Sequence, residues 1–494
     1  MLTTRFAPSP TGFLHIGSLR TALYSYLFAK QNKGKFILRI EDTDQKRYVE
    51  GATESLIHTL SWFGLDYDEG PELIDGKIIE KGENGPYFQS ARTAIYKKYA
   101  EELLEKGHAY RCFCTAERLE QMRTDQTAKK LAPMYDRACL YLSPEEIEKK
   151  MKNGEKYVIR QKMSYEQKIT FEDTIRGHME FDSKNIDDQV LIKSDGFPTY
   201  HLANVVDDHL MGVTHVIRGE EWLPSTPKHI ALYQALGWQH PIFAHLPLLL
   251  NPDKTKLSKR QGDVAAEDYI KKGYLKEAII NFIALLGWNP GTTEEFFTLR
   301  DLIEKFSIER VQKAGAVFNL EKLNWLNAHY IRQKSPEELA KLITPTLPDW
   351  FEKSPYKNNK YLLKTIKIIQ TRLETLAQAS ELLKFFFVPE VEFNHDLLLN
   401  EKMKVDAPTA KLVLEESLRA LKALPENDFE TEEKIKTSLM EVIQKLNLKN
   451  GQVLWPLRVA LTGEQYSPGA FEVISGLGKE ISLKRIQTYI DKLV

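Results

Sequence analysis

The chain has 494 residues, of which 42% are hydrophobic and 28% charged, and its formal net charge is −1. This length predicts about three domains, and the near-zero charge excludes nucleic-acid binding through overall positive charge alone. Three cysteines in so long a chain exclude a disulfide framework, and the most apolar run, at 278–286, is too short to span a bilayer. We therefore expect a cytoplasmic protein with no membrane segment, in which any RNA is recognised by local basic patches and by shape.

The N-terminal segment alternates strand and helix signals. Residues 3–7 predict a buried strand, and apolar residues at helical spacing predict a helix that ends at Gly34, before a second strand at 35–40. A strand, a helix and a strand joined by short turns form a βαβ unit, which requires a parallel sheet. Because such sheets bind ligands at the carboxyl ends of their strands, segments 8–17 and 41–44 are the first candidates for a site.

The next part of the chain gives mixed signals. Residues 70–85 are acidic and rich in turn formers, which predicts a loop, and a helix is expected at 90–105 with Ser90 as its N-cap. The region from there to 188 holds all three cysteines and reads as an inserted domain.

Strand and helix signals then return in a simpler order. Strands are expected at 189–193 and 213–218, with a helix at 200–208 between them. From Lys271 onward the sequence is almost entirely amphipathic helix, which predicts a bundle or stacked helix pairs.

The turn after the first strand reads Pro-Ser-Pro-Thr-Gly-Phe-Leu-His-Ile-Gly-Ser over residues 8–18. Its prolines stiffen the turn, and Gly12 and Gly17 remove side chains where a ligand can approach the backbone. The helix N-terminus that follows is a natural seat for phosphate, and His15 is placed to donate a hydrogen bond to a phosphoryl oxygen. On these residues alone, a capped turn with a surface histidine remains the alternative.

A second polar segment, at 254–262, reads Lys-Thr-Lys-Leu-Ser-Lys-Arg-Gln-Gly. Two lysines flanking Leu-Ser on a loop that ends in glycine can form a cationic clamp for phosphates. A solvated run of charge is the alternative.

Together the two segments resemble the paired signatures of class I aminoacyl-tRNA synthetases. Further segments are similar to the bacterial glutamyl-tRNA synthetases, and they lie at 5–12, 39–44, 200–209, 217–222 and 456–463. The resemblance therefore runs in order from the first strand to the last helices.

The resemblance implies a fold and a domain order. We expect an α/β Rossmann-like class I catalytic domain with an α+β insertion, followed by an all-α anticodon-binding region. The implied boundaries are 1–95 and 189–250 for the catalytic domain, 96–188 for the acceptor-binding insertion, 251–330 for a linking region with the lysine loop, and 331–494 for the helical anticodon-binding region.

The resemblance also implies a reaction. ATP and Mg²⁺ activate L-glutamate to glutamyl-adenylate, and the glutamyl group then passes to the 3′-terminal adenosine of tRNA(Glu), with tRNA(Gln) as a further candidate. No enzyme nucleophile is needed, because catalysis depends on stabilising the charge on the phosphoryl oxygens. Glutamate activation is expected to require bound tRNA, and a monomer is the default.

Site residues follow by resemblance. The catalytic residues are His15, Lys256 and Lys259. ATP is assigned to Pro8, Ser9, Gly12, His15, Gly17, Ser18, Lys256, Leu257, Ser258, Lys259 and Arg260. Glutamate is assigned to Arg5, Ser9, Glu41, Tyr200, Asn204 and Arg218. Glu41 suits the α-ammonium and the two arginines suit carboxylates, since a guanidinium offers a rigid two-donor fork. For both arginines a structural ion pair is the alternative.

A zinc site is a further expectation. Some family members hold zinc with three cysteines and a histidine two positions after the last, but this chain has Tyr141 there. Residues 135–139 instead resemble the Tyr-x-x-x-Cys half of the zinc site in a short paralogue. The candidate ligands are Cys112, Cys114, Tyr135 and Cys139, in a structural role. A site that has lost its metal and keeps reduced thiols is the alternative.

Three other readings compete. Glutaminyl-tRNA synthetases resemble Pro-Glu-Pro-Asn-Gly where this chain has residues 8–12, and their C-terminal half is rich in strands. A different class I nucleotidyltransferase would not need the helical C-terminal half. An inactive tRNA-binding relative would have no reason to keep His15, Lys256 and Lys259.

Overall fold

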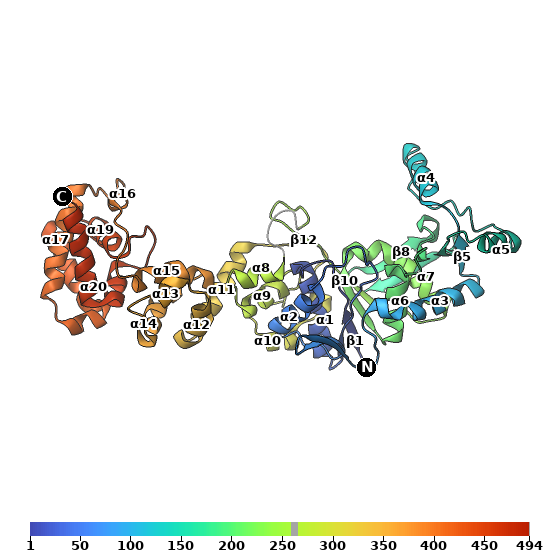
Figure 1. Cartoon of the computed structure of the whole chain (residues 1–494), viewed down its shortest axis with the longest axis horizontal. Helices are drawn as coiled ribbons and strands as arrows, with labels where there is room; N and C mark the ends of the chain where they lie inside the picture. Colours follow the sequence, from blue (N-terminus) through green and yellow to red (C-terminus); the bar gives the residue numbers. More distant parts are fainter. Residues whose placement is uncertain (258–264, 494) are drawn as a thin grey trace. The chain divides into compact units, whose positions relative to one another are not determined.

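The computed structural model describes residues 1–257 and 265–493, and the chain divides into two compact units (Figure 1). Unit one comprises Met1–Tyr269 and Ile279–Leu320, and unit two comprises Ile270–Ala278 and Glu321–Val494. In the described part of the chain, every helix falls short of the length and apolarity that crossing a membrane requires.

Unit one opens with the expected βαβ unit. Strand β1 (Thr3–Phe6) leads into helix α1 (Ile16–Gln31) and strand β2 (Lys35–Leu38), and β1 pairs with β2 in parallel. On the other side of β1, the backbone N–H of Thr214 donates to the carbonyl of Thr3 at 3.0 Å, which brings β10 (His215–Gly219) beside it. The βαβ prediction is therefore confirmed.

The chain between β2 and β10 supplies most of the remaining elements of unit one. These are α2 (Ala52–Phe63), β3 (Gly70–Ile74), β4 (Lys77–Lys81), α3 (Thr93–Glu105), β5 (Ala109–Cys112), α4 (Ala116–Ala128), α5 (Pro144–Lys152), β6 (Val158–Gln161), β7 (Lys168–Asp173), β8 (Gly177–Asp182), β9 (Val190–Ile192) and α6 (Tyr200–Leu210). Strand β6 pairs with β5 and β9 in one antiparallel sheet, so the region expected as an insertion mixes helices with strands.

After β10 the chain adds strands and helices around a second sheet. It forms α7 (Thr226–Leu236), β11 (Ile242–Leu246), β12 (Leu249–Leu250), α8 (Ala266–Lys271), α9 (Lys276–Ala284), α10 (Leu299–Lys305) and β13 (Ala316–Val317). Strand β11 pairs in parallel with both β10 and β7, and β8 pairs with β7 to close a four-stranded sheet. Strands β9 and β10 and helix α6 confirm the elements expected between residues 189 and 218.

The loop expected at 70–85 is wrong in its first part. Strands β3 and β4 pair there in antiparallel register, with Ile74 opposite Lys77. The two residues between them, Asp75 and Gly76, both have positive φ, at 49° and 74°. Such an Asp-Gly pair favours a two-residue hairpin turn, and it is the signal that an acidic, turn-rich composition hid.

The expected N-cap at Ser90 is also wrong. A short 3₁₀ turn over Gln89–Arg92 precedes α3, which begins at Thr93. Ser90 instead binds Asp42, which accepts from its backbone N–H at 2.8 Å and from its hydroxyl at 2.5 Å. A tertiary partner therefore replaces the local cap.

Unit two confirms the all-α expectation in its described residues. Its helices are α11 (Leu320–Gln333), α12 (Pro336–Ile343), α13 (Asp349–Glu352), α14 (Asn359–Ile369), α15 (Ala379–Phe387), α16 (His395–Leu398), α17 (Ala407–Ala423), α18 (Glu432–Leu446), α19 (Asn450–Thr462) and α20 (Ala470–Lys492). Their apolar faces share one core, and Figure 1 shows α17, α19 and α20 packed together. Gly476 lets α20 approach α15, since a Cβ there would overlap Phe386.

Candidate active site

A cavity of about 980 Å³ lies at the ends of β1, β2 and β10 in unit one. Most of the expected site residues line it, namely Arg5, Pro8, Ser9, Gly12, His15, Ser18, Glu41, Tyr200 and Arg218. Gly17, Asn204, Lys256 and Leu257 are described but do not line it. Lys256 is exposed, and Ser258, Lys259 and Arg260 lie outside the described residues.

His15 is the N-cap of α1. Its Nδ1 accepts a hydrogen bond from the backbone N–H of Gly17 at 2.9 Å. Because Nδ1 is an acceptor, the proton of the neutral ring resides on Nε2, which makes Nε2 a donor. A donor beside a helix N-terminus suits an anion such as phosphate.

Arg5, on β1, is held by a buried carboxylate. Its Nε donates to both oxygens of Asp208 at 3.1 and 3.3 Å, and its Nη2 donates to Asn204 Oδ1 at 3.3 Å. Asp208 also accepts from Arg39 Nη1 at 2.7 Å, so one carboxylate serves two buried arginines. Burial alone would raise the pKa of Asp208, but Arg5 and Arg39 bring it below its usual range.

Glu41 follows β2 and is buried against Arg39. Its Oε1 accepts from Arg39 Nη2 at 3.1 Å. Burial raises the pKa of Glu41 to about 7, against the opposing effect of Arg39 and Arg5. A second cation at the cavity would therefore favour the ionised form of Glu41.

Arg218, on β10, contrasts with Arg5. It donates to His245, Tyr200, His229 and Thr226, all neutral groups, at 2.8 to 3.3 Å. In the part of the chain that the structure describes, Arg218 forms no ion pair with a carboxylate, although its side chain is buried. A buried guanidinium without a counter-charge attracts an anionic ligand, since isolated buried charge is costly.

The aromatic wall of the cavity stands beside Arg218. The rings of Tyr200 and Trp222 lie 4.2 Å apart between centroids, and Tyr200 receives one of the hydrogen bonds of Arg218. Both residues line the cavity, so they close one side of it with apolar surface.

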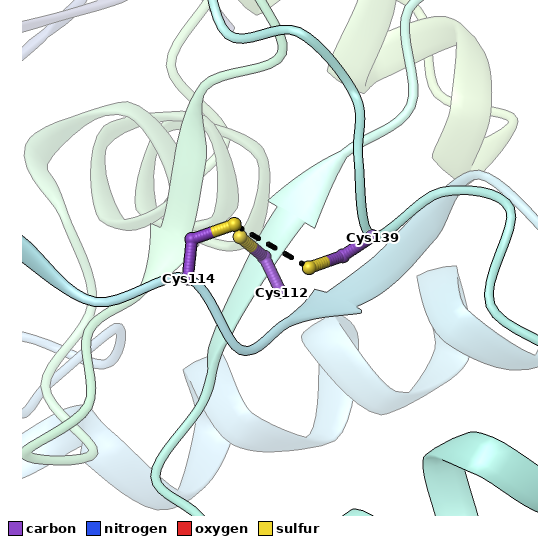
Figure 2. A group of neighbouring side chains, drawn as sticks. All are labelled: Cys112, Cys114 and Cys139. Atoms are coloured by element: carbon purple, nitrogen blue, oxygen red, sulfur yellow. Dashed lines mark hydrogen bonds between the residues drawn. The ribbon is translucent and has the colours of Figure 1, made fainter. Parts of the chain in front are cut away.

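The three cysteines come together at a place that does not line this cavity (Figure 2), and Tyr135 lies beside them. The cysteine sulfurs lie within 4.8 Å of one another, and the Tyr135 hydroxyl lies 3.2 Å from both Cys112 Sγ and Cys114 Sγ. Figure 2 shows Cys139 approaching from a separate segment, with its sulfur 3.5 Å from that of Cys114. Hydrogen bonds, chiefly from Cys139, lower the pKa of the Cys112 thiol to about 4. The set fits zinc, since sulfurs bound to one tetrahedral zinc are about 3.8 Å apart.

Several residues that shape the site were not identified from the sequence. Asp208 and Arg39 stand inside segments that carry the family resemblance, but no local pattern marks them as partners of Arg5 and Glu41. His245 and Asp173 lie behind Arg218 and are 72 residues apart, so only the pairing of β7 with β11 reveals them.

Comparisons with known proteins agree over the whole length. A family described as "tRNA synthetases class I (E and Q), catalytic domain" matches residues 1–325, and an anticodon binding domain matches residues 338–490. A glutamate–tRNA ligase of Clostridium tetani is 48% identical over 494 residues, covering 100% of this chain and 98% of that protein. One from Chlorobium phaeobacteroides is also 48% identical, over 99% of this chain and 98% of its own.

Solved structures give the same result. A glutamate tRNA ligase of Elizabethkingia meningosepticum, solved in complex with its amino acid, superposes with a TM-score of 0.87 at 37% identity, covering 100% of both chains. A glutamate–tRNA synthetase of Elizabethkingia anophelis has a TM-score of 0.84 at 37% identity, covering 99% of each chain.

The shared carboxylate predicts a large effect of one substitution. Asp208→Asn keeps the shape but leaves Arg5 and Arg39 short of counter-charge in a buried place, so the free energy of unfolding of unit one should fall by about 3 to 5 kcal/mol. Urea unfolding followed by circular dichroism measures this. Asp44→Asn is the control, because the Asp44 side chain is 43% exposed and its ion pair with Arg47 lies at the surface, so little change in stability is expected. Equal stability of the two variants would contradict the assigned role of Asp208.

Proposed function

The chain belongs to the class I tRNA synthetases for glutamate and glutamine, whose catalytic-domain model matches residues 1–325, and from this premise we infer that it is a glutamate–tRNA ligase. The likeness to glutamate–tRNA ligases over the whole chain supports glutamate over glutamine as the amino acid. An anticodon binding domain at 338–490 supports tRNA as the acceptor and opposes a nucleotidyltransferase without that region.

The charges in the cavity carry the proposal for glutamate. Free glutamate has two carboxylates and one ammonium, and the cavity offers two buried arginines and one buried glutamate, Arg5, Arg218 and Glu41. Each arginine presents a rigid fork of donors that matches a carboxylate. Of the two arginines, Arg218 is the better receptor for a glutamate carboxylate, because its own hydrogen-bond partners are neutral. Asn204 contributes from behind, by holding Arg5.

The turn at 8–18 receives ATP. Pro8, Ser9, Gly12 and Ser18 line the cavity beside His15, whose Nε2 donates toward the α-phosphate. Gly17 supplies the backbone N–H that orients the His15 ring. From the lysine loop, Lys256, Leu257, Ser258, Lys259 and Arg260 complete the ATP site, and Mg²⁺ arrives on the ATP phosphates as part of that substrate.

The reaction proceeds in two transfers. A carboxylate oxygen of the glutamate α-carboxylate attacks the α-phosphorus, and the bond to pyrophosphate breaks, which gives glutamyl-adenylate. His15 and the lysines stabilise the negative charge that grows on the phosphoryl oxygens. A ribose hydroxyl of the tRNA's terminal adenosine then attacks the activated carbonyl and releases AMP. The chain supplies orientation and charge, and no residue forms a covalent intermediate.

The tRNA contacts follow the domain order. Residues 96–188 hold the acceptor end beside the catalytic domain at 1–95 and 189–250, residues 251–330 link the parts, and residues 331–494 read the anticodon of tRNA(Glu). The bound tRNA completes the site, so that glutamate is activated only when the correct acceptor is present.

Cytoplasmic location and a monomeric state belong to the same proposal. The three free cysteines suit a reducing compartment.

Pyrophosphate exchange tests the activity. We expect ATP–pyrophosphate exchange with glutamate only when tRNA(Glu) is present, with glutamine inactive and tRNA(Gln) compared in parallel. His15→Ala should lower the exchange rate roughly 100- to 1000-fold, because it removes a preorganised donor. His58→Ala, at an exposed position of α2, should leave it unchanged. Folded protein that exchanges with glutamate in neither condition would contradict the proposal.

We also propose that Cys112, Cys114, Cys139 and Tyr135 hold a structural zinc ion. Purified protein should contain about one zinc per chain by mass spectrometry of the metal. Cys139→Ser should lose it, and Tyr135→Phe should weaken its retention during dialysis against a chelator, whereas Tyr141→Phe, which changes an exposed tyrosine, should behave as the parent. Purified protein that contains no zinc, and whose three thiols all react with a thiol reagent, would rule the zinc out. Unchanged thermal stability after removal of the zinc would rule out its structural role.

A further inference from the structure

A layer of buried polar groups stands behind Arg218. Strand β11 places His245 against it, with Nε2 3.1 Å from Arg218 Nε, and α7 supplies Thr226 and His229. Behind His245 stands Asp173 of β7, whose Oδ2 lies 2.6 Å from His245 Nδ1. Both Asp173 and His245 are buried, and neither lines the cavity.

The chemistry of arginine determines which nitrogen of His245 carries the proton. A guanidinium has only donors, so His245 must present a bare Nε2 to Arg218 Nε. The ring's proton therefore resides on Nδ1 and is donated to Asp173. Thr226 Oγ1, 3.1 Å from the same Nε2, accepts from Arg218 Nη2 and can donate its own hydrogen.

The histidines on the other side obey the same rule. His229 Nδ1 lies 3.3 Å from Arg218 Nη1 and must accept, so its Nε2 carries the proton and donates to His201 Nδ1 at 3.0 Å. Burial, aided by nearby cations, lowers the pKa of His201 to about 4 and that of His229 well below its usual range. Burial lowers the pKa of His245 to about 4 despite its bond to Asp173. All three rings are thus neutral at physiological pH, as the hydrogen bonds require.

Asp173 is itself fixed by the backbone. Its Oδ1 accepts from the N–H groups of Ile175 at 3.0 Å, Arg176 at 2.8 Å and His245 at 3.3 Å. That oxygen is committed to donors, which leaves Oδ2 alone to face the imidazole. The direction of the carboxylate is therefore set by the turn between β7 and β8.

We propose that Asp173 is a positioning residue for the amino-acid substrate: acting through His245, it holds the Arg218 guanidinium with its donors aimed at the substrate carboxylate. This inference rests on the proposed function, since it takes Arg218 as the receptor of a glutamate carboxylate. Asp173 touches no substrate, and its effect comes from the tautomer of His245.

One substitution tests the tautomer directly. In Asp173→Asn the amide oxygen stays with the three backbone donors, and the NH₂ group replaces Oδ2 opposite His245. The imidazole of His245 must then accept at Nδ1 and carry its proton on Nε2. The Nε2–H group would face the N–H of Arg218, and two donors cannot form a hydrogen bond. The guanidinium is displaced although the side chain keeps its size.

Steady-state exchange kinetics measure the consequence. Asp173→Asn should raise the KM for glutamate roughly 10- to 100-fold, by analogy with the loss seen when the hydrogen-bond partner behind a metal-ligating histidine is removed. The KM for ATP should change little, because the described hydrogen bonds of Arg218 go to His245, Tyr200, His229 and Thr226 and not to the turn at 8–18. A structural role alone would instead lower thermal stability and leave both KM values unchanged, and that result would overturn the proposal.

A second variant removes the link between Asp173 and Arg218. His245→Phe keeps a ring on β11 but has no nitrogen to bond Arg218 or Asp173, so it should by itself raise the glutamate KM, and this keeps the proposal testable if Asp173→Asn folds poorly. Where both variants fold, Asp173→Asn should add little to the glutamate KM in the His245→Phe background, and a full additive effect would show that Asp173 does not act through His245.

Two controls separate the possible failures. Glu172→Gln changes the neighbouring residue of β7, which forms an equally short pair with His178 at 2.6 Å but on the exposed face, and it should alter neither KM. Arg218→Gln should raise the glutamate KM more than Asp173→Asn does. If Arg218→Gln has no effect, the assignment of Arg218 to glutamate fails. If it has its effect and Asp173→Asn has none, only the positioning role fails.

Discussion

Asp208 accepts hydrogen bonds from Arg5 and Arg39 inside unit one, and the arrangement of the cavity depends on this shared carboxylate. It ties α6 to Arg5 of β1 and to Arg39, which directly follows β2, across 203 and 169 residues of sequence. Arg39 in turn holds Glu41. Arg5 and Glu41, which we propose to receive a carboxylate and the ammonium of glutamate, are therefore positioned together, and losing Asp208 would disturb both.

The two arginines of the cavity, Arg5 and Arg218, differ in whether a carboxylate of the protein compensates their charge. The charge of Arg5 is compensated by Asp208 before any ligand arrives, whereas Arg218 is surrounded by neutral acceptors. A substrate carboxylate thus gains more at Arg218, where it supplies the missing counter-charge in a buried place. Neutral histidines suit this position, because they hold the guanidinium without cancelling the charge that attracts the ligand.

The sequence predicted what depends on local pattern. The βαβ unit and the positions of the turn at 8–18 and of Glu41 at the strand ends follow from local pattern, whereas the cavity position of Arg218 was expected from the family resemblance. The layer behind Arg218 could not be predicted this way, since Asp173 meets His245 only through strand pairing across 72 residues. Ser90 shows the same limit, because a distant aspartate replaced its expected local role.

The most direct test of this account is a crystal structure of the protein with bound glutamate. We predict a carboxylate of the ligand within hydrogen-bond distance of Arg218, its ammonium at Glu41, and Arg218 still bonded to His245 and Thr226. Glutamate bound with no carboxylate at Arg218, or an Arg218 side chain turned away from His245 to meet it, would contradict the claim that neutral partners hold this charge ready for the substrate.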